Sequence, residues 1–207
     1  MRLPGLALSL LVASLVPAGA RAADIALDLG HSTSASLVRL SGTILPRELY
    51  KVEDVVAEAR QKRPGKPIVF VLNSRGGHHF EGMVIGLFLK RKGIGTAIPP
   101  GATCESACGS IFFGGSNART GKPDRVVYEG GRLGVHRWRR ADGGQLTVQE
   151  SDRAQGGAAW FLDQVAISKA VQTKVFETPP ASMYYLTAED LAGSTIPLRS
   201  AAAAPKM

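Results

Sequence analysis

The chain has 207 residues, of which 44% are apolar, and a formal net charge of +8. This length suits one domain, and this apolar share is enough to build a core, so wholesale disorder is excluded. Charged residues make up only 20% and form no long basic run, which argues against a dedicated nucleic-acid binder. Two cysteines are too few for a disulfide scaffold or a four-cysteine zinc site.

Residues 1–22 have the pattern of a secretory signal peptide. Arg2 supplies the positive start, Leu6–Val16 is an apolar run, and Ala20–Ala22 fits an A-x-A cleavage site. The run is shorter than the roughly 20 residues that span a bilayer. An uncleaved anchor or a buried helix is the alternative. We expect cleavage before Ala23 and a mature chain that is periplasmic or secreted, with membrane contact at most peripheral.

The mature part alternates between strand-like and helix-like patterns with short connections. Strands are predicted over residues 35–45, 68–72, 94–98, 126–128 and 133–136. Apolar stripes at helical spacing predict one helix from Leu49 to Ala59 and another from Phe80 to Phe88, which Gly93 is expected to end. Three more helices are predicted over Glu105–Phe113, Trp160–Phe176 and Leu186–Ala192. Thr187 is the expected N-cap of the last one. This alternation predicts βαβ units, a mainly parallel sheet and one α/β domain over residues 23–199. Residues 200–207 are expected to form a flexible tail.

Three features fall where strands are predicted to end, which is where reactive groups gather in α/β sheets. Gly76 and Gly77 follow the strand over 68–72, and such a pair lets backbone N–H groups approach a ligand. Ser106 opens a predicted helix, in a field that suits an anionic intermediate, and His136 ends a strand. Taken singly, each has a plainer interpretation as a turn, an N-cap or a structural histidine.

The order and spacing of these motifs resemble the proteolytic subunit of Clp protease. Phe70–Gly115 matches its core, with Arg75 in place of a proline, and Gly134–His136 and Tyr185–Asp190 match later segments. The resemblance implies a Clp/crotonase-like fold, a spiral of βαβ units with a mainly parallel sheet. It is closest to exported members of that group.

By position, the resemblance makes Ser106 the nucleophile and His136 the general base, with the backbone N–H groups of Gly77 and Ala107 as the oxyanion hole. It implies hydrolysis of a peptide or protein substrate through an acyl-enzyme, with no metal or cofactor, and a homo-oligomer. Because ATP is scarce outside the cytoplasm, we expect no ATP-dependent unfoldase as partner. Export likewise argues against a crotonase-type reaction on coenzyme A thioesters.

One departure concerns the aspartate that completes the family's triad. The corresponding stretch, Pro179–Tyr184, has no carboxylate; Ser182 is its nearest polar residue, and Glu177 precedes it. Loss of the orienting aspartate from a triad costs about 10⁴ in kcat. Three possibilities stay open: a Ser–His dyad enzyme, recruitment of another orienting group, or a non-catalytic envelope protein that binds peptides or partners in the same groove.

The remaining polar motifs have open interpretations. Cys104 and Cys108 flank Ser106 and either form a disulfide or remain two buried thiols. His78 and His79 follow the glycine pair and are expected to line the groove; His31 is too distant in sequence to complete a metal site with them. The basic cluster Arg137–Arg140 is interpreted as solvated surface, or as a contact for anionic polymers or headgroups.

Overall fold

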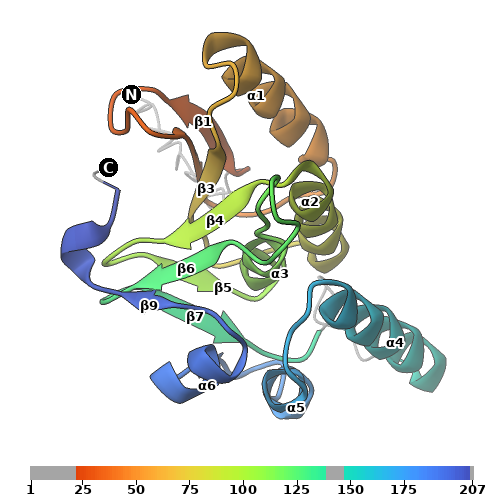
Figure 1. Ribbon diagram of the computed structural model, residues 1–207. Coiled ribbons are helices and arrows are strands. Elements are labelled where there is room, and N and C mark those ends of the chain that lie inside the picture. The colour runs from red at the N-terminus through yellow and green to blue at the C-terminus, as the bar shows by residue number, and fades with distance from the viewer. Residues whose placement is uncertain (1–21, 139–146, 206–207) are drawn as a thin grey trace, which may run out of the picture.

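The computed structural model describes residues 22–138 and 147–205, a mixed α/β fold on a mostly parallel sheet (Figure 1). The predicted signal peptide lies outside the described residues apart from Ala22, as do Arg139 and Arg140 of the basic cluster. The strands are β1 (Asp24–Asp28), β2 (Ser36–Ser41), β3 (Ile68–Asn73), β4 (Gly95–Ile98), β5 (Thr103–Glu105), β6 (Arg125–Tyr128), β7 (Arg132–Val135), β8 (Tyr184–Tyr185) and β9 (Leu198–Arg199). The helices are α1 (Leu49–Lys62), α2 (His79–Lys92), α3 (Ala107–Phe113), α4 (Val148–Gln164), α5 (Lys169–Glu177), α6 (Ala188–Gly193) and the 3-10 helix Ala201–Ala203.

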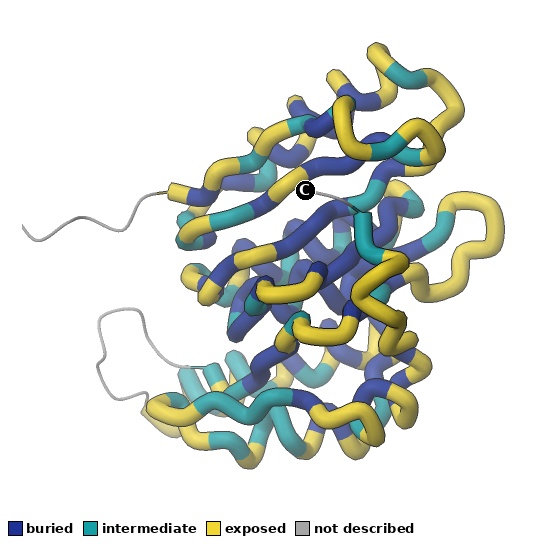
Figure 2. The backbone as a smooth tube through the Cα atoms, turned by 90° about the vertical axis from the view of Figure 1, so that its left-hand side faces the viewer, coloured by how far each residue is buried: buried dark blue, intermediate teal, exposed yellow. Residues whose placement is uncertain are grey.

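The main sheet has the strand order β1-β2-β3-β4-β6-β9. All neighbouring strands in it run parallel except β1, which pairs antiparallel with β2. The central strand β3 has the apolar run Ile68–Leu72, as expected for a strand covered on both faces. In Figure 2 the middle of the molecule is correspondingly buried, while the connections at its rim are exposed. The predicted α/β class with a mainly parallel sheet is confirmed.

The helices α1, α2 and α3 lie together on one side of this sheet (Figure 1). The helix α1 buries Val52, Val55, Val56 and Ala59, which share one face by helical periodicity. The predicted stop of α2 is confirmed, because Gly93 caps it in the left-handed conformation with φ 64°. The predicted N-cap Thr187 is also confirmed, since its hydroxyl accepts the N–H of Asp190 at 3.2 Å.

A second, smaller sheet has the order β5-β7-β8, and the sequence did not predict it. Strand β5 runs parallel to β7, with Glu105 opposite Gly134, and β8 pairs antiparallel with β7. The prediction that the helix begins at Glu105 is therefore wrong: Glu105 ends β5, and α3 begins at Ala107. Pairing with a strand almost thirty residues away overrides the local helical pattern.

The predicted long helix Trp160–Phe176 is also wrong, because two helices, α4 and α5, share this part of the chain. The break lies at Ala166, which has φ 53°. The buried guanidinium of Arg125 donates hydrogen bonds to the carbonyls of Phe113, Val165 and Ala166 at 2.6, 2.9 and 3.1 Å. The carbonyls at the end of α4, which have no partner within the helix, thus accept hydrogen bonds from Arg125. Ser168 then caps the start of α5.

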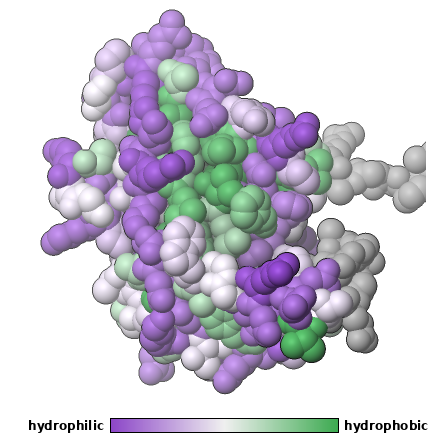
Figure 3. All heavy atoms as spheres, turned by 90° about the vertical axis from the view of Figure 1, so that its right-hand side faces the viewer, coloured by the Kyte–Doolittle hydropathy of each residue, from purple (hydrophilic) through white to green (hydrophobic). Residues whose placement is uncertain are grey.

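The surface carries scattered apolar side chains as well as polar ones. Figure 3 shows one face on which apolar side chains gather in the middle, with hydrophilic side chains around them. The most exposed large apolar residues include Phe80 on α2 and Val148 and Trp160 on α4. In the described part of the chain, no helix has the length and apolar character needed to cross a membrane.

Candidate active site

Ser106 lies at a sharp turn between β5 and α3. Its backbone has φ 55° and ψ −120°, a conformation that a residue with a side chain rarely adopts. Such a conformation costs about 1–3 kcal/mol and persists only where the surroundings hold it. The same kind of strained strand-to-helix turn presents the serine nucleophile in α/β-hydrolases, because it exposes the hydroxyl.

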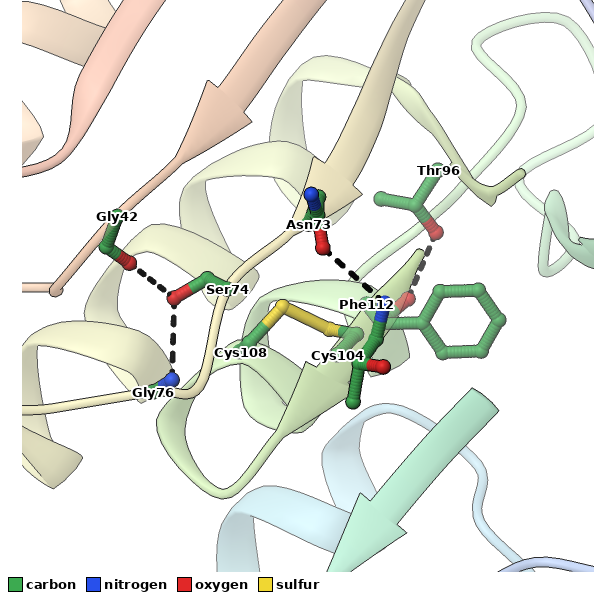
Figure 4. Close-up of a disulfide and its surroundings, with 9 residues drawn as sticks. Gly42, Asn73, Ser74, Gly76, Thr96, Cys104, Cys108 and Phe112 are labelled. Atoms are coloured by element: carbon green, nitrogen blue, oxygen red, sulfur yellow. Dashed lines mark hydrogen bonds between the residues drawn. A yellow bond between two sulfur atoms is a disulfide. The ribbon is translucent and has the colours of Figure 1, made fainter. Parts of the chain in front are cut away.

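The surroundings of Ser106 hold this turn in place. Its own N–H donates to the carbonyl of Gly134 at 3.0 Å, and the N–H of Glu105 donates to the carbonyl of Ser74 at 3.0 Å. A disulfide joins Cys104 to Cys108, on either side of the serine in sequence, with Cα atoms 5.2 Å apart (Figure 4). Both cysteines are fully buried. The serine is therefore fixed by a covalent link as well as by two strands.

The turn at Gly76 and Gly77 lies directly against Ser106. The two glycines have φ 91° and φ 146°, values that favour glycine. A methyl group placed on Gly76 would lie 2.9 Å from Cβ of Ser106 and 3.0 Å from the backbone nitrogen of Ala107. The hydroxyl of Ser74 accepts the N–H of Gly76 at 3.0 Å and donates to the carbonyl of Gly42, which fixes the start of the turn (Figure 4).

The backbone N–H groups of Gly77 and Ala107 lie on this shared boundary. Ile44 pairs with the other edge of the glycine turn: its N–H donates to Gly76 at 2.9 Å, and its carbonyl accepts from His78 at 2.7 Å. Within the described part of the chain, neither Gly77 nor Ala107 donates its backbone N–H to another group. Two available donors beside a serine hydroxyl can stabilise an oxyanion that forms on attack.

His136 follows directly on β7. Because β5 and β7 run parallel with Glu105 opposite Gly134, Ser106 and His136 leave neighbouring strands at the same end. Both residues line one pocket, and His136 is half-buried there. The structure therefore brings Ser106 and His136 to one pocket; Ala107 follows Ser106 directly, and Gly77 follows Gly76, which packs against Ser106.

The pocket is mostly apolar and contains about 420 Å³ of empty space, part of it open to solvent. Helices α3, α4 and α5 and the end of β7 supply its apolar lining: Phe113, Val135, Trp138, Ala158, Phe161, Leu162 and Val175. Its polar lining consists of His79, Ser106, Ser110 and His136. An apolar cavity with a few convergent polar groups is the usual form of a small-molecule or peptide side-chain site.

His79 is the second histidine of this pocket. Burial, followed by the positive charge of protonated His136 and His78, lowers its pKa from 6.5 to about 4. Its ring lies 6.1 Å from the ring of Trp138, and its Nε2 is buried without a hydrogen-bond partner in the described part of the chain. His79 is therefore neutral near pH 7, which suits a wall of the pocket. The expectation that both histidines line the groove holds for His79, whereas His78 caps α2 by accepting the N–H of Glu81 at 3.2 Å.

A buried carboxylate directly precedes the serine. Glu105 accepts a hydrogen bond from the hydroxyl of Tyr185, and this hydrogen bond is the main cause that raises the pKa of that tyrosine. The guanidinium of Arg132 lies 3.6 Å from the centre of the Tyr185 ring. These contacts tie β8 to β5 across β7 and so strengthen the strand from which Ser106 emerges.

The segment expected to carry a triad carboxylate runs beside the end of β7. The N–H of Arg137 donates to the carbonyl of Thr178 at 2.9 Å, and Tyr184 and Tyr185 pair with β7. Residues 179–184 between these points contain no carboxylate, and Glu177 is exposed at the end of α5. In this segment the structure offers no acid in place of the aspartate.

No metal site emerges from the described part of the chain. It contains no group of three or more histidine, cysteine, aspartate or glutamate side chains arranged to hold a metal ion. His31 contacts Asp28 at 2.8 Å, near the start of the chain.

Most of the pocket's lining was missed by reasoning from the sequence. Ser110 and Phe113 had a usable signal, because they follow Ser106 at helical spacings of four and seven residues. Phe161, within the predicted helix Trp160–Phe176, is 1% exposed and lines the pocket. The other wall residues come from α4, α5 and the chain at and after the end of β7, and their meeting at the pocket depends on tertiary packing.

The comparisons with known proteins agree on the fold. No model of a known protein family matches the chain, and no curated protein matches it by sequence. Among solved structures, it is similar to a mutant of the membrane-bound stomatin-specific protease 1510-N, with 16% identity, a TM-score of 0.58, and coverage of 79% of this chain and 77% of that one. It is also similar to a mutant of ClpP1 from Listeria monocytogenes, with 17% identity, a TM-score of 0.57, and coverage of 76% and 86%. The chain has a Clp-protease-like fold, as its sequence motifs predicted.

Proposed function

We propose that this protein is an exported serine hydrolase that cleaves peptides. The observation that carries the proposal is the turn at Ser106: a strained serine lies between a strand and a helix and packs against the Gly76–Gly77 turn. Structural neighbours named as proteases share the fold. Export is proposed from the sequence of residues 1–22.

In the proposed mechanism, His136 takes the proton from the Ser106 hydroxyl as the oxygen attacks the carbonyl carbon of the substrate. The N–H groups of Gly77 and Ala107 stabilise the oxyanion of the tetrahedral intermediate. His136 then returns the proton to the leaving amine, and the acyl group stays on Ser106. Water, deprotonated by His136, attacks the ester and releases the acid, which regenerates the serine.

The pocket beside Ser106 favours substrates with an apolar side chain next to the cleaved bond. Seven of its lining side chains are apolar, and the neutral form of His79 adds no charge near pH 7. A charged substrate side chain would lose its hydration there without gaining a partner of opposite charge. We propose an unfolded or extended peptide as substrate and a homo-oligomer as the working form.

The second candidate function is a non-catalytic envelope protein that binds peptide segments in the same pocket. The specific observation in its favour is the carboxylate-free segment 179–184, which runs beside the strand that ends at His136.

A cleavage assay separates the two candidates. The mature protein is incubated with a library of peptides, and products are identified by mass spectrometry, with Ser106→Ala as the matched control. Hydrolysis by the parent, absent in Ser106→Ala and concentrated after apolar residues, supports the hydrolase. Peptide binding of equal affinity in both proteins, without products, supports the binding protein instead.

A further inference from the structure

Glu48 is a buried carboxylate that lies against the start of the described chain. It is 2% exposed and directly precedes α1. Its Oε1 accepts the backbone N–H of Ala23 at 2.9 Å and lies 3.4 Å from the ammonium of Lys51. Its Oε2 is also buried and has no hydrogen-bond partner in the described part of the chain. A buried carboxylate oxygen without a donor is costly, so this site is short of a positively charged donor.

Ala23 is the residue at which the sequence predicts the mature chain to begin. Cleavage of the Ala22–Ala23 bond adds one water: the hydroxyl forms the carboxyl group that leaves with Ala22, and the hydrogen stays on the nitrogen of Ala23. The resulting amine binds a further proton near neutral pH, because α-amino groups have a pKa of about 7.7–8.0. Its nitrogen is the atom that already lies 2.9 Å from Glu48.

We propose that Glu48 is the binding site for the α-ammonium group of Ala23, formed when a leader peptidase cleaves the Ala22–Ala23 bond. The new group has three donors where the amide has one, so it can serve both carboxylate oxygens. Glu48 is 2% exposed, so its charge gains a close partner at a site that solvent hardly reaches. This inference rests on the predicted cleavage, and it is independent of the proposed hydrolase activity.

The charged groups around Glu48 do not already provide it with a strong cationic partner. Arg47 and Lys51 lie next to Glu48 along the chain, Asp24 lies next to Ala23, and Glu81 binds the residues on either side of Glu48. Glu81 is already engaged by the backbone N–H groups of Arg47 and Leu49 at 3.0 and 2.7 Å. Within the described residues, Lys51 is the one cation within 4 Å of Glu48, and its side chain is 52% exposed. Solvent therefore weakens the attraction between Lys51 and Glu48.

The site is continuous with the candidate active site. Asp24, the residue after Ala23, pairs with Ser41, and Ile44, three residues further along, pairs with Gly77 in the glycine turn. Fixing the new N-terminus at Glu48 thus strengthens the segment against which the candidate oxyanion hole is built. Cleavage before Ala23 would in this way stabilise the observed conformation of the Gly76–Gly77 turn.

A stability comparison tests the proposal. One protein begins at Ala23; the other is extended to Ala20 and carries Arg21→Gln, which keeps the amide N–H at Ala23 but removes the charge there. Both are also made with Glu48→Gln. We expect the protein that begins at Ala23 to melt about 2 to 8 °C higher than the extended one at pH 7, and Glu48→Gln to abolish this difference. Equal melting of the first pair, or the same difference in the Glu48→Gln pair, would overturn the proposal.

A second measurement uses the parent sequence alone, so it does not depend on the folding of Glu48→Gln. The pKa of the α-amino group of Ala23 is measured by NMR in the folded protein. Pairing with Glu48 raises this pKa above the range of about 7.7–8.0 found in peptides. The stabilisation is then complete below the unfolded pKa and is lost as the pH rises through the folded one. A pKa within or below the peptide range would contradict the ion pair.

Discussion

Ser106 and the glycine turn pack so closely that one added methyl group on either glycine would collide with backbone atoms. A methyl group on Gly77 would lie 2.1 Å from the carbonyl oxygen of Ile44, and one on Gly76 would lie 2.6 Å from the carbonyl oxygen of Glu105. Both contacts are with backbone, which cannot move aside as a flexible side chain does. The position of the Gly77 N–H therefore depends on the absence of a side chain.

We expect Gly77→Ala to reduce the proposed activity at least 100-fold, because the turn must shift and withdraw one oxyanion donor. The matched control is Gly101→Ala. Gly101 has φ 75°, but a methyl group placed on it would meet no atom within 4 Å, so this change should cost only about 1–2 kcal/mol of stability and leave activity intact. Rates of peptide cleavage and urea unfolding measure the two effects. Equal activity of the two variants would show that the glycine turn has no part in the reaction.

His79 gives the protein a predicted sensitivity to acid. Its folded pKa is lowered to about 4 from 6.5, so the unfolded chain binds a proton between these values while the folded chain does not. Stability therefore falls as the pH falls from about 6.5 to 4, by up to about 3 kcal/mol from this group. Urea unfolding at pH 7.5, 6 and 5 should show this loss in the parent and a smaller loss in His79→Gln. An identical pH dependence in both proteins would exclude His79 as its source.

The candidate site residues could be predicted from the sequence because short motifs fix their local geometry. The glycine pair and the serine at a helix start are visible as short local motifs, but their joint role came from the resemblance to the Clp proteolytic subunit, because each motif alone has a plainer interpretation. The disulfide could not be decided, because helical spacing between Cys104 and Cys108 permits but does not favour it. The structure places Cys104 in β5 and Cys108 in α3, and the turn between these elements brings the two together.

At the scale of elements, Arg125 joins the ends of two helices that wall the pocket. It is 2% exposed and donates to the carbonyls of Phe113 at the end of α3 and of Val165 and Ala166 after α4. No sequence pattern marked it, since an arginine in a strand is usually a surface residue. The same contacts explain why one long helix was predicted over Trp160–Phe176 where two exist: the apolar pattern continues, but the backbone leaves the helix to meet a distant guanidinium.

We expect Arg125→Leu to destabilise the protein by about 3 kcal/mol or more, because two buried carbonyls and one part-buried carbonyl lose their donor. Arg119→Leu, in an exposed loop, is the matched control and should change stability by less than about 0.5 kcal/mol. Urea unfolding of both variants measures the difference. A loss in Arg125→Leu no larger than in the control would mean that these hydrogen bonds do not hold α4 in place.

At the scale of the whole molecule, the fold follows from the alternation of strands and helices, while the second sheet needed information from far along the chain. Strand β5 has only three residues and gains its partners from β7 and from the end of β3. Strands this short carry no usable periodicity. The pocket lies where α4 and α5 meet the end of β7, so its shape depends on the complete fold.

The exposed apolar residues of α4 bear on the predicted homo-oligomer. Val148 and Trp160 are 79% and 56% exposed, so this helix has apolar side chains that a contact between copies would bury. We expect light scattering at micromolar concentration to give a multiple of the chain mass, and Trp160→Glu to lower it. A monomeric mass for the parent protein would contradict the prediction.

The central claim is that Ser106 is an activated nucleophile, and covalent labelling tests it most directly. The mature protein is treated with a fluorophosphonate and its intact mass is measured, with Ser106→Ala and His136→Ala as controls and circular dichroism to confirm folding. We expect a single adduct on the parent that disappears in Ser106→Ala and forms far more slowly in His136→Ala. A folded parent protein that gains no adduct, or an adduct that persists in Ser106→Ala, would contradict it.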